Sequence, residues 1–140
     1  MGFSMSVLIL NKRARFEYHL LESYQAGLVL SGELVKAIRE RKISLRSAYV
    51  VSYRNGLHLI GLKKGETDYT VPLLLRQNEI EEIRGAITQK NITCVPINIK
   101  RVGRWFKTEI ALAKGKKEYD KRETIKRRDL ERDLRRNGIV

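Results

Sequence analysis

The sequence predicts a mainly β domain, a closed antiparallel barrel of about six short strands with two to three short helices and a C-terminal tail. Three observations predict this class. Residues 16–30 alternate apolar and polar side chains with a period of two, which is typical of a half-buried strand. Two further pairs of apolar segments flank glycine-containing turns, as hairpins do. A highly charged segment that is poor in apolar residues then ends the chain.

The first predicted strand and helix lie within residues 16–41. The apolar parity of the strand comprises Phe16, Tyr18, Leu20, Tyr24, Ala26, Leu28 and Leu30. Gly27 is the expected bend, because barrel strands must curve. Ser31 can cap a helix that runs to about Arg41, with Leu34, Val35 and Ile38 directed inward.

The middle of the chain predicts a hairpin, a loop and a short strand. Residues 48–53 and 57–62 flank Arg54-Asn55-Gly56, and Asn-Gly is the strongest short hairpin signal. Residues 63–70 are polar and predict a loop. Residues 71–75 predict a short strand at an edge or end of the sheet, because Pro72 has no N–H to donate.

The last elements of the predicted domain are a helix and a second hairpin. Asn78 is the expected cap of a helix to about Lys90, whose first turn is acidic. Residues 92–100 and 105–113 predict two strands around a turn at residues 101–104. The predicted barrel domain therefore spans residues 1–113, and its basic character suits an OB-like barrel that binds a ligand.

The charge of the chain indicates an anionic partner. The sequence has 29 Lys and Arg against 16 Asp and Glu, a formal net charge of +13. Phosphate backbones attract such a surface by counterion release and long-range steering. A membrane partner would require a broad amphipathic helix or a lipidation signal, and the sequence contains neither. Nucleic acid is the favoured partner class, without a membrane.

Several other classes are disfavoured by what the sequence contains. Cys94 is the only cysteine, which argues against disulfide and zinc frameworks, and it is expected to be a small buried apolar residue. His19 and His58 lie far apart in predicted strands without a catalytic partner. No signal peptide or membrane span is apparent. We therefore expect a cytosolic protein that is not an enzyme and needs no cofactor or metal.

Aromatic residues interleaved with cations predict how an RNA would be held. Exposed rings stack on unpaired bases while neighbouring cations bind phosphates, although most rings in a small domain belong to the core. Phe16 is the preferred stacking residue because it lies near Arg13 at the start of the long strand. Lys107 is a further expected RNA contact.

The segment 114–140 predicts a basic tail. It carries 11 basic and 6 acidic residues, with acid-first pairs four residues apart such as Glu118 with Arg122. Its few apolar residues form only a thin stripe, so the tail has little to fold against. A helix that is ordered by a highly charged partner is one interpretation. A solvated surface helix or an idle tail is the more common fate of such a segment.

Two separated motifs resemble one family along most of the chain. Residues 11–18 with residues 22–32 resemble the start, and residues 113–122 with Ile125-Lys126 the most characteristic motif, of the small protein B family of bacterial SsrA-binding proteins. The resemblance implies an OB-like barrel that binds the tRNA-like domain of transfer-messenger RNA (tmRNA, also called SsrA RNA) in trans-translation. It also implies a tail that is disordered when free and becomes helical in the empty mRNA channel of a stalled 70S ribosome, near the rRNA of the decoding centre. Elongation factor Tu carrying aminoacylated tmRNA would be an indirect partner, and the protein would act as a bacterial cytoplasmic monomer.

The resemblance also implies individual roles. RNA contacts are implied for Asn11, Gln25, Leu74 and Lys107, and a basic stem for Lys114, Lys116 and Lys117. Ribosome contacts are implied for the tail residues Asp120, Lys121, Arg122, Ile125, Lys126, Arg127 and Arg128. The sequence departs from the family at Phe16, where His is usual, at Gln25, where Glu is usual, and at Leu34, where a Glu would complete a capping box with Ser31. The loop at residues 63–70 is also shorter.

Two alternatives stay open at this point. A generic OB-type RNA-binding module or ribosome-associated structural protein would use the tail as a nonspecific anchor. An enzyme would depend on His19 or His58.

Overall fold

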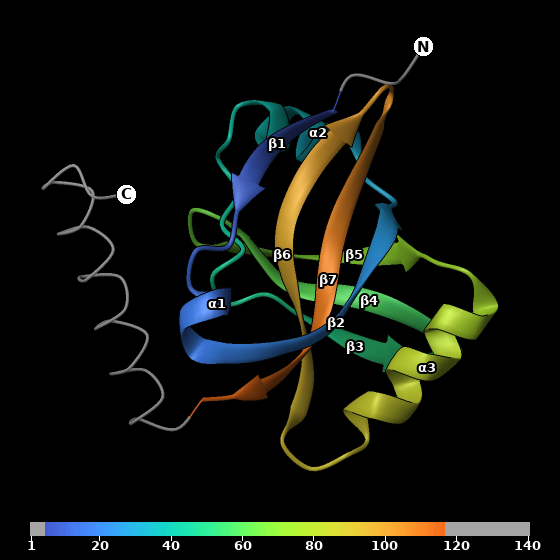
Figure 1. Cartoon of the computed structure of the whole chain (residues 1–140). Helices are drawn as coiled ribbons and strands as arrows, with labels where there is room; N and C mark the ends of the chain where they lie inside the picture. The colour runs from blue at the N-terminus through green and yellow to red at the C-terminus, as the bar shows by residue number, and fades with distance from the viewer. Residues whose placement is uncertain (1–4, 117–140) are drawn as a thin grey trace, which may run out of the picture.

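A computed structural model describes residues 5–116 of the chain. It contains one antiparallel sheet and three short helices (Figure 1). In chain order the elements are β1 (Met5–Leu10), α1 (Ala14–Glu17), β2 (Tyr18–Leu28), α2 (Gly32–Arg39), β3 (Tyr49–Tyr53), β4 (Gly56–Lys64), β5 (Thr67–Leu74), α3 (Gln77–Ile87), β6 (Ile92–Val102) and β7 (Trp105–Gly115). The predicted mainly β, antiparallel class with small helices is confirmed.

The sheet has seven strands in the order β1-β6-β7-β2-β5-β4-β3. Strands β1 and β3 are the two edges of this sheet. Among the described residues, backbone hydrogen bonds therefore do not close the sheet into the predicted barrel. The sheet curls instead, with β3, β4 and β5 crossing the direction of β6 and β7 (Figure 1), and β3 packs against β6 without pairing with it.

Strand β1 raises the number of strands from the expected six to seven. It pairs with β6, from Met5 opposite Val102 to Leu10 opposite Asn98. The prediction missed this strand because a short apolar run cannot be assigned to a strand by periodicity alone.

The segment before β2 is a helix rather than the start of the long strand. The N–H groups of Phe16 and Glu17 donate to the carbonyl of Arg13 at 3.1 and 2.8 Å. This turn buries Ala14. The register of β2 against β7 shifts between Leu20 and Ser23, so Tyr18 and Leu20 lie on the opposite face from Tyr24 and Ala26. The predicted alternation therefore holds only from Tyr24, and the strand ends at Leu28 rather than at residue 30.

Two predicted turns differ in detail. Arg54 and Asn55, with φ of 48° and 63°, form the centre of the β3–β4 turn, and Gly56 is already paired with Tyr53. Residues 63–70, predicted as a loop, instead continue β4 and β5 into a tight hairpin in which Lys64 pairs with Thr67. Polar residues on an exposed hairpin resemble a loop in sequence.

The prediction placed Pro72 at an edge or an end of the sheet. Strand β5 lies inside the sheet, between β2 and β4, so the edge position is wrong, whereas Pro72 does lie at the end of the pairing between β2 and β5. Pro72 pairs with His58 of β4, and its carbonyl accepts the Val29 N–H at 3.1 Å. In an antiparallel ladder a residue's N–H and C=O point to the same side. The missing N–H therefore faces the position where β2 has already ended.

The two longer helices begin at different kinds of cap. Helix α2 follows Ser31, whose Oγ accepts the Leu34 N–H at 3.3 Å, as predicted. Helix α3 begins after Arg76, not at the predicted Asn78. Glu79 Oε1 accepts the Arg76 N–H at 3.2 Å, so the acidic first turn supplies the bond that caps the helix.

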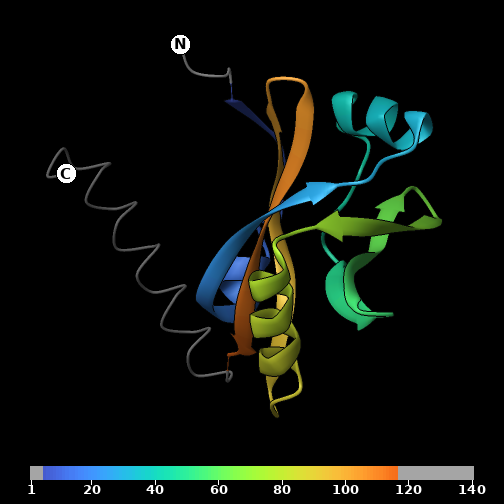
Figure 2. The same ribbon diagram turned by 90° about the vertical axis from the view of Figure 1, so that its right-hand side faces the viewer.

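Two apolar clusters lie on opposite faces of the sheet. The main core gathers residues of α2 and α3, such as Ile38 and Ile83, with the inward side chains of the strands. The smaller cluster packs Ala14 of α1 on the opposite surface, which we call the outer face, against Val95, Ile97, Ala111 and Ala113. Figure 2 shows α1 on one side of the β2–β6–β7 layer and α2 with β3 and β4 on the other.

Within residues 5–116, no helix is long and apolar enough to cross a membrane. The same part of the chain contains no group of three or more His, Cys, Asp or Glu side chains that could hold a metal ion.

Candidate nucleic-acid interface

Strand β7 divides the outer face into a covered and an uncovered part. Its outward residues Ala111 and Ala113 lie beneath α1, in the smaller cluster. The outward residues Lys107 and Glu109, nearer the start of β7, pair with Gly27 and Gln25 of β2 and belong to neither apolar cluster. The sheet therefore presents polar side chains immediately beside α1.

A groove of about 680 Å³ occupies the uncovered part. Gln25 of β2, Leu74 at the end of β5 and Lys107 of β7 all line it, although they come from three distant parts of the sequence. The remaining lining residues are Ser23, Tyr24, Gly27, Leu75, Arg76 and Glu79. Three of the implied RNA contacts thus share one site.

Gly27 forms the floor of this groove. It pairs with Leu74 on one side and with Lys107 on the other. A Cβ at this position would lie 3.3 Å from the Leu74 Cβ, so a larger residue would press against Leu74. Leu74 is itself 62% exposed. An exposed leucine beside an ammonium group can receive the apolar face of a sugar or base while the cation binds phosphate.

Hydrogen bonds organise the polar side chains around the groove. Gln25 Nε2 donates to Glu109 Oε1 at 3.3 Å, which orients the amide across the two strands. The Tyr24 hydroxyl donates to Glu82 Oε2 at 3.0 Å. Burial, followed by this bond to Glu82, raises the pKa of Tyr24, so the phenol stays a neutral donor.

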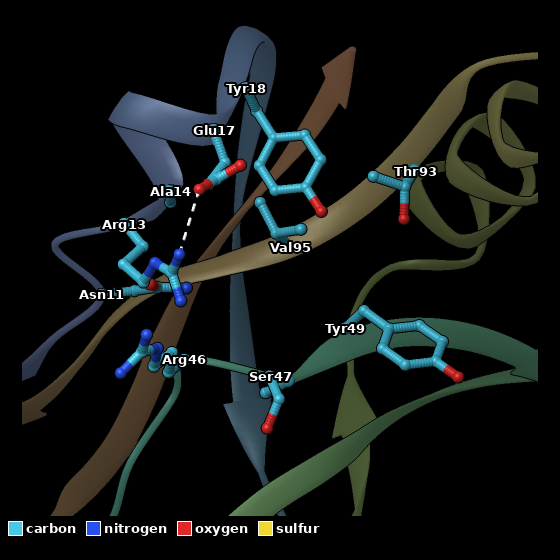
Figure 3. A pocket seen from close by; sticks show the side chains of 11 residues that line it. Asn11, Arg13, Ala14, Glu17, Tyr18, Arg46, Ser47, Tyr49, Thr93 and Val95 are labelled. Carbon is cyan, nitrogen blue, oxygen red and sulfur yellow. Dashed lines mark hydrogen bonds and ion pairs between the residues drawn. The ribbon is translucent and has the colours of Figure 1, made fainter. Parts of the chain in front are cut away.

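A second group of predicted residues surrounds a polar hollow of about 540 Å³ next to α1 (Figure 3). The Asn11 amide donates to the carbonyls of Pro96 at 2.8 Å and Leu45 at 3.3 Å. These bonds fix the corner between β1 and α1, and they engage the amide donors of Asn11 within the protein. Arg13 Nη2 contacts Glu17 Oε1 at 3.2 Å, as the dashed line in Figure 3 shows.

The chain leaving β7 is attached to α1. Lys116 donates its backbone N–H to the Glu17 carbonyl at 3.0 Å and its Nζ to the Arg15 carbonyl at 2.8 Å. Lys114 is exposed within β7, and Phe16 is half-buried on α1. The predicted residues Lys117, Asp120, Lys121, Arg122, Ile125, Lys126, Arg127 and Arg128 lie outside the described residues.

Glu109 lies between the groove and the α1 region. It bonds Gln25 of the groove, and it also lines a hollow with Asn11, Lys12 and Arg15. The two groups of predicted residues are therefore parts of one outer surface. Sequence reasoning missed Glu109, Arg76 and Glu79. Local sequence pattern does not predict that residue 25 pairs with residue 109. Arg76 and Glu79 closely follow the Leu73-Leu74-Leu75 run, which the family resemblance includes, and could have been predicted from it.

The two histidines lie on different strands of the sheet. His19 lies on β2 and His58 on β4, and neither lines the groove or the hollow next to α1. Cys94 is buried, as expected, and burial raises its pKa to about 12. Its thiol is therefore a core group rather than a nucleophile.

Comparisons with known proteins agree with this architecture. The SsrA-binding protein of Coprothermobacter proteolyticus is 44% identical over 149 residues, covering 97% of this chain and 99% of that protein. The SsrA-binding protein of a Psychrobacter species is 45% identical over 137 residues, covering 90% of this chain and 87% of that protein. One chain of the solved structure "tmRNA-SmpB: a journey to the center of the bacterial ribosome" matches with a TM-score of 0.64 and 32% identity, covering 79% of this chain and 86% of that one.

The sequence also matches the family model described as SmpB protein, over residues 8–138. This match extends over both the β domain and most of the basic tail. The chain belongs to the SmpB protein family.

Proposed function

We propose that this protein binds tmRNA through the outer face of its sheet and acts in trans-translation, the rescue of stalled ribosomes. One observation carries the RNA-binding part of the proposal. Gln25, Leu74 and Lys107, which the family resemblance names as RNA contacts, line a single groove although they lie on three strands. Relatives named SsrA-binding protein over nearly their full length support the identity of the RNA.

The chemistry of the groove suits binding without catalysis. Lys107 and Arg76 supply cations for phosphates, Leu74 supplies an exposed apolar contact, and Gln25 supplies an amide that can read a base or ribose edge. The partner is the tRNA-like domain of tmRNA, and the protein acts on it as a binder rather than as an enzyme.

The C-terminal tail supplies the ribosomal part of the proposed function. Residues 114–140 carry 11 basic and 6 acidic side chains, and the part of this segment after Lys116 enters the empty mRNA channel of a stalled 70S ribosome and folds there as a helix against rRNA. Attachment of Lys116 to α1 supports this proposal, because it sets the point from which the tail leaves the outer face. Aminoacylated tmRNA arrives with elongation factor Tu, and the protein works as a cytoplasmic monomer.

We also propose that the domain is an OB-like barrel. Packing of β3 against β6 supports an OB-like barrel of six strands whose last seam lacks backbone pairing, with β1 as an added edge strand.

Competition binding distinguishes this function from that of a generic basic RNA binder. Labelled tRNA-like domain is bound to the full-length protein and challenged with an excess of bulk RNA. We expect the complex to survive the challenge while its affinity falls steeply with salt, because phosphate contacts contribute to it. Loss of the complex at low competitor ratios would support the generic binder and contradict tmRNA specificity.

A further inference from the structure

We propose that Tyr53 and Arg54, on the β3–β4 hairpin, form a stacking site for one unpaired base of the RNA that occupies the groove. This inference rests on the proposed function and adds a subsite to it. It places an RNA contact on a part of the sheet that lies outside the groove lining.

The register of the sheet brings Tyr53 into one row with the groove. Tyr53 pairs with Gly56, and Leu57 pairs with Leu73, so Gly56 comes beside Leu74. Leu74 pairs with Gly27, which pairs with Lys107. Strands lie about 4.8 Å apart, so Tyr53 is two strands, or roughly 10 Å, from Leu74 along the outer face. One or two nucleotides span such a distance.

Two of the three residues that lie between Tyr53 and Lys107 in this row are glycines, so few side chains rise above the sheet surface there. Gly56 and Gly27 present only backbone toward the outer face. A Cβ at Gly56 would meet nothing closer than the Tyr53 carbonyl at 3.8 Å. An RNA strand can therefore lie across the row from Lys107 past Leu74 to Tyr53 without displacing a bulky side chain other than Leu74 itself.

The ring of Tyr53 is held in an orientation that suits stacking. It is 57% exposed. His58 meets it at 5.8 Å between ring centroids and an interplanar angle of 74°, so the imidazole supports the phenol without covering it face to face. The Arg54 guanidinium carbon lies 5.3 Å from the ring centroid. Such a cation can remain stacked beside a bound base or pair with its phosphate.

The charge of the surrounding segment identifies the occupant as RNA. Residues 41–65 contain six cations and no carboxylate. The cations are Arg41, Lys42, Arg46, Arg54, Lys63 and Lys64. Lys42 and Lys64 form ion pairs with Glu40 and Glu33, which lie outside the segment, and Arg54 is the cation that contacts the Tyr53 ring. The neighbouring acid Glu81 of α3 lines a hollow beside Ser52 together with Arg84. A basic hairpin with an exposed, pre-oriented ring next to an RNA groove is a stacking platform for an unpaired base.

The test compares full-length variants for binding to the tRNA-like domain of tmRNA in the presence of bulk RNA. Tyr53→Leu should weaken binding roughly 5- to 100-fold, the range expected for one stacked base. Tyr53→Phe, the matched control that keeps the ring, should bind within about twofold of wild type, since stacking needs no hydroxyl. Tyr53→Leu should leave the slope of log affinity against log salt unchanged, whereas Arg54→Gln should reduce it by about one unit.

Lys107→Ala in the same assay separates failure of the subsite from failure of the proposed function. Wild-type affinity for Tyr53→Leu together with weak binding by Lys107→Ala would overturn the stacking site and leave the groove intact. Wild-type affinity for both variants would overturn the groove as well. Equal weakening of Tyr53→Leu and Tyr53→Phe would also overturn the stacking site, because it would assign the loss to the hydroxyl. Thermal unfolding of each variant confirms that it is folded.

Discussion

At the scale of single residues, Lys107 and Leu74 depend on a glycine for their common groove. Gly27 pairs with both of them, and its missing side chain leaves the floor of the groove open. The neighbouring bond from Gln25 to Glu109 fixes the amide on the same surface. The candidate interface is thus formed by residues that are neighbours on adjacent strands rather than by a single loop.

Cys94 provides a residue-scale prediction about the core. Its side chain is fully buried, and burial raises its pKa to about 12, so thiolate is scarce at neutral pH. We expect a thiol reagent at pH 7.5 to label native protein far more slowly than protein unfolded in guanidinium, where the pKa returns to about 8.5. Equal labelling rates in the two states would contradict the burial of Cys94.

Phe16 provides a second prediction at this scale. It lies half-buried on α1, where part of its ring remains accessible. If one base stacks on it, Phe16→Ala should weaken binding of the tRNA-like domain by about 1–3 kcal/mol, while Phe16→His should be nearly neutral. The measurement is RNA affinity, with thermal unfolding as the control for folding. Unchanged affinity in a folded Phe16→Ala variant would contradict the stacking role and leave the ring with a packing role on α1.

At the scale of elements, the connection between α2 and β3 passes very close to strand β4. Gly61 has a φ of +75°, and a Cβ there would lie 2.6 Å from the Ser47 carbonyl oxygen. The β4–β5 register shifts at this point, between Leu59 and Leu62. Gly61 therefore allows β4 to bend beneath the connection between α2 and β3.

Two glycine substitutions should consequently have opposite effects. Gly61→Ala should lower the free energy of unfolding by about 2 kcal/mol or more, because it adds left-handed backbone strain and a clash with backbone. Gly85→Ala, inside α3 with open space around it, should raise it by about 0.5–1 kcal/mol. Denaturant unfolding of both variants measures the difference. A neutral Gly61→Ala would show that the β4 bend is not as tight as described.

Sequence pattern identified those elements whose signals are local. The Ser31 cap, the hairpin at Asn55 and the period-two alternation from Tyr24 to Leu28 all depend on neighbouring residues, and each is present. Strand β1 and the interior position of Pro72 depend on pairing with distant strands, which pattern does not specify. Helix α1 is one turn long and is stabilised by burial of Ala14 in a cluster that forms only when β6 and β7 are in place.

Sequence pattern predicted less of the candidate site than of the fold. Charge and aromatic content indicated RNA and pointed to Arg13, Phe16 and Lys107. Only the family resemblance added Gln25 and Leu74 to Lys107, because their convergence requires the β7-β2-β5 strand order. Tyr53 was one of several aromatic residues that the sequence offered as possible base-stacking residues. Its position in line with the groove follows only from the register of the sheet.

At the scale of the whole molecule, the proposed function assigns RNA binding to the domain and ribosome entry to the tail. The tail has few apolar residues with which to contact the domain. Truncation after Lys116 should therefore change thermal stability and affinity for the tRNA-like domain little, while tagging of stalled peptides is lost. A reconstituted stalled-ribosome assay measures tagging, and binding to the isolated RNA serves as the control.

Finer changes in the tail should give the same separation. Combined Asp120→Ala, Lys121→Ala and Arg122→Ala substitutions should abolish tagging while RNA binding persists. Ile125→Pro should do so by disrupting a helix, at about 3 kcal/mol or more. Efficient tagging by the truncated protein would contradict the proposed role of the tail.

Lys107 is the RNA contact on the outer face that matters most for the proposed function. The decisive measurement is the dissociation constant for the tRNA-like domain of tmRNA, in excess bulk RNA, for Lys107→Ala and for the matched control Lys36→Ala. Lys36 is an exposed lysine on α2 that lies outside the groove lining, so both variants lose one positive charge. We predict clearly weaker binding and a salt slope lower by about one unit for Lys107→Ala, with affinity near that of wild type for Lys36→Ala. Equal affinities of the two variants would contradict the groove as the tmRNA-binding site.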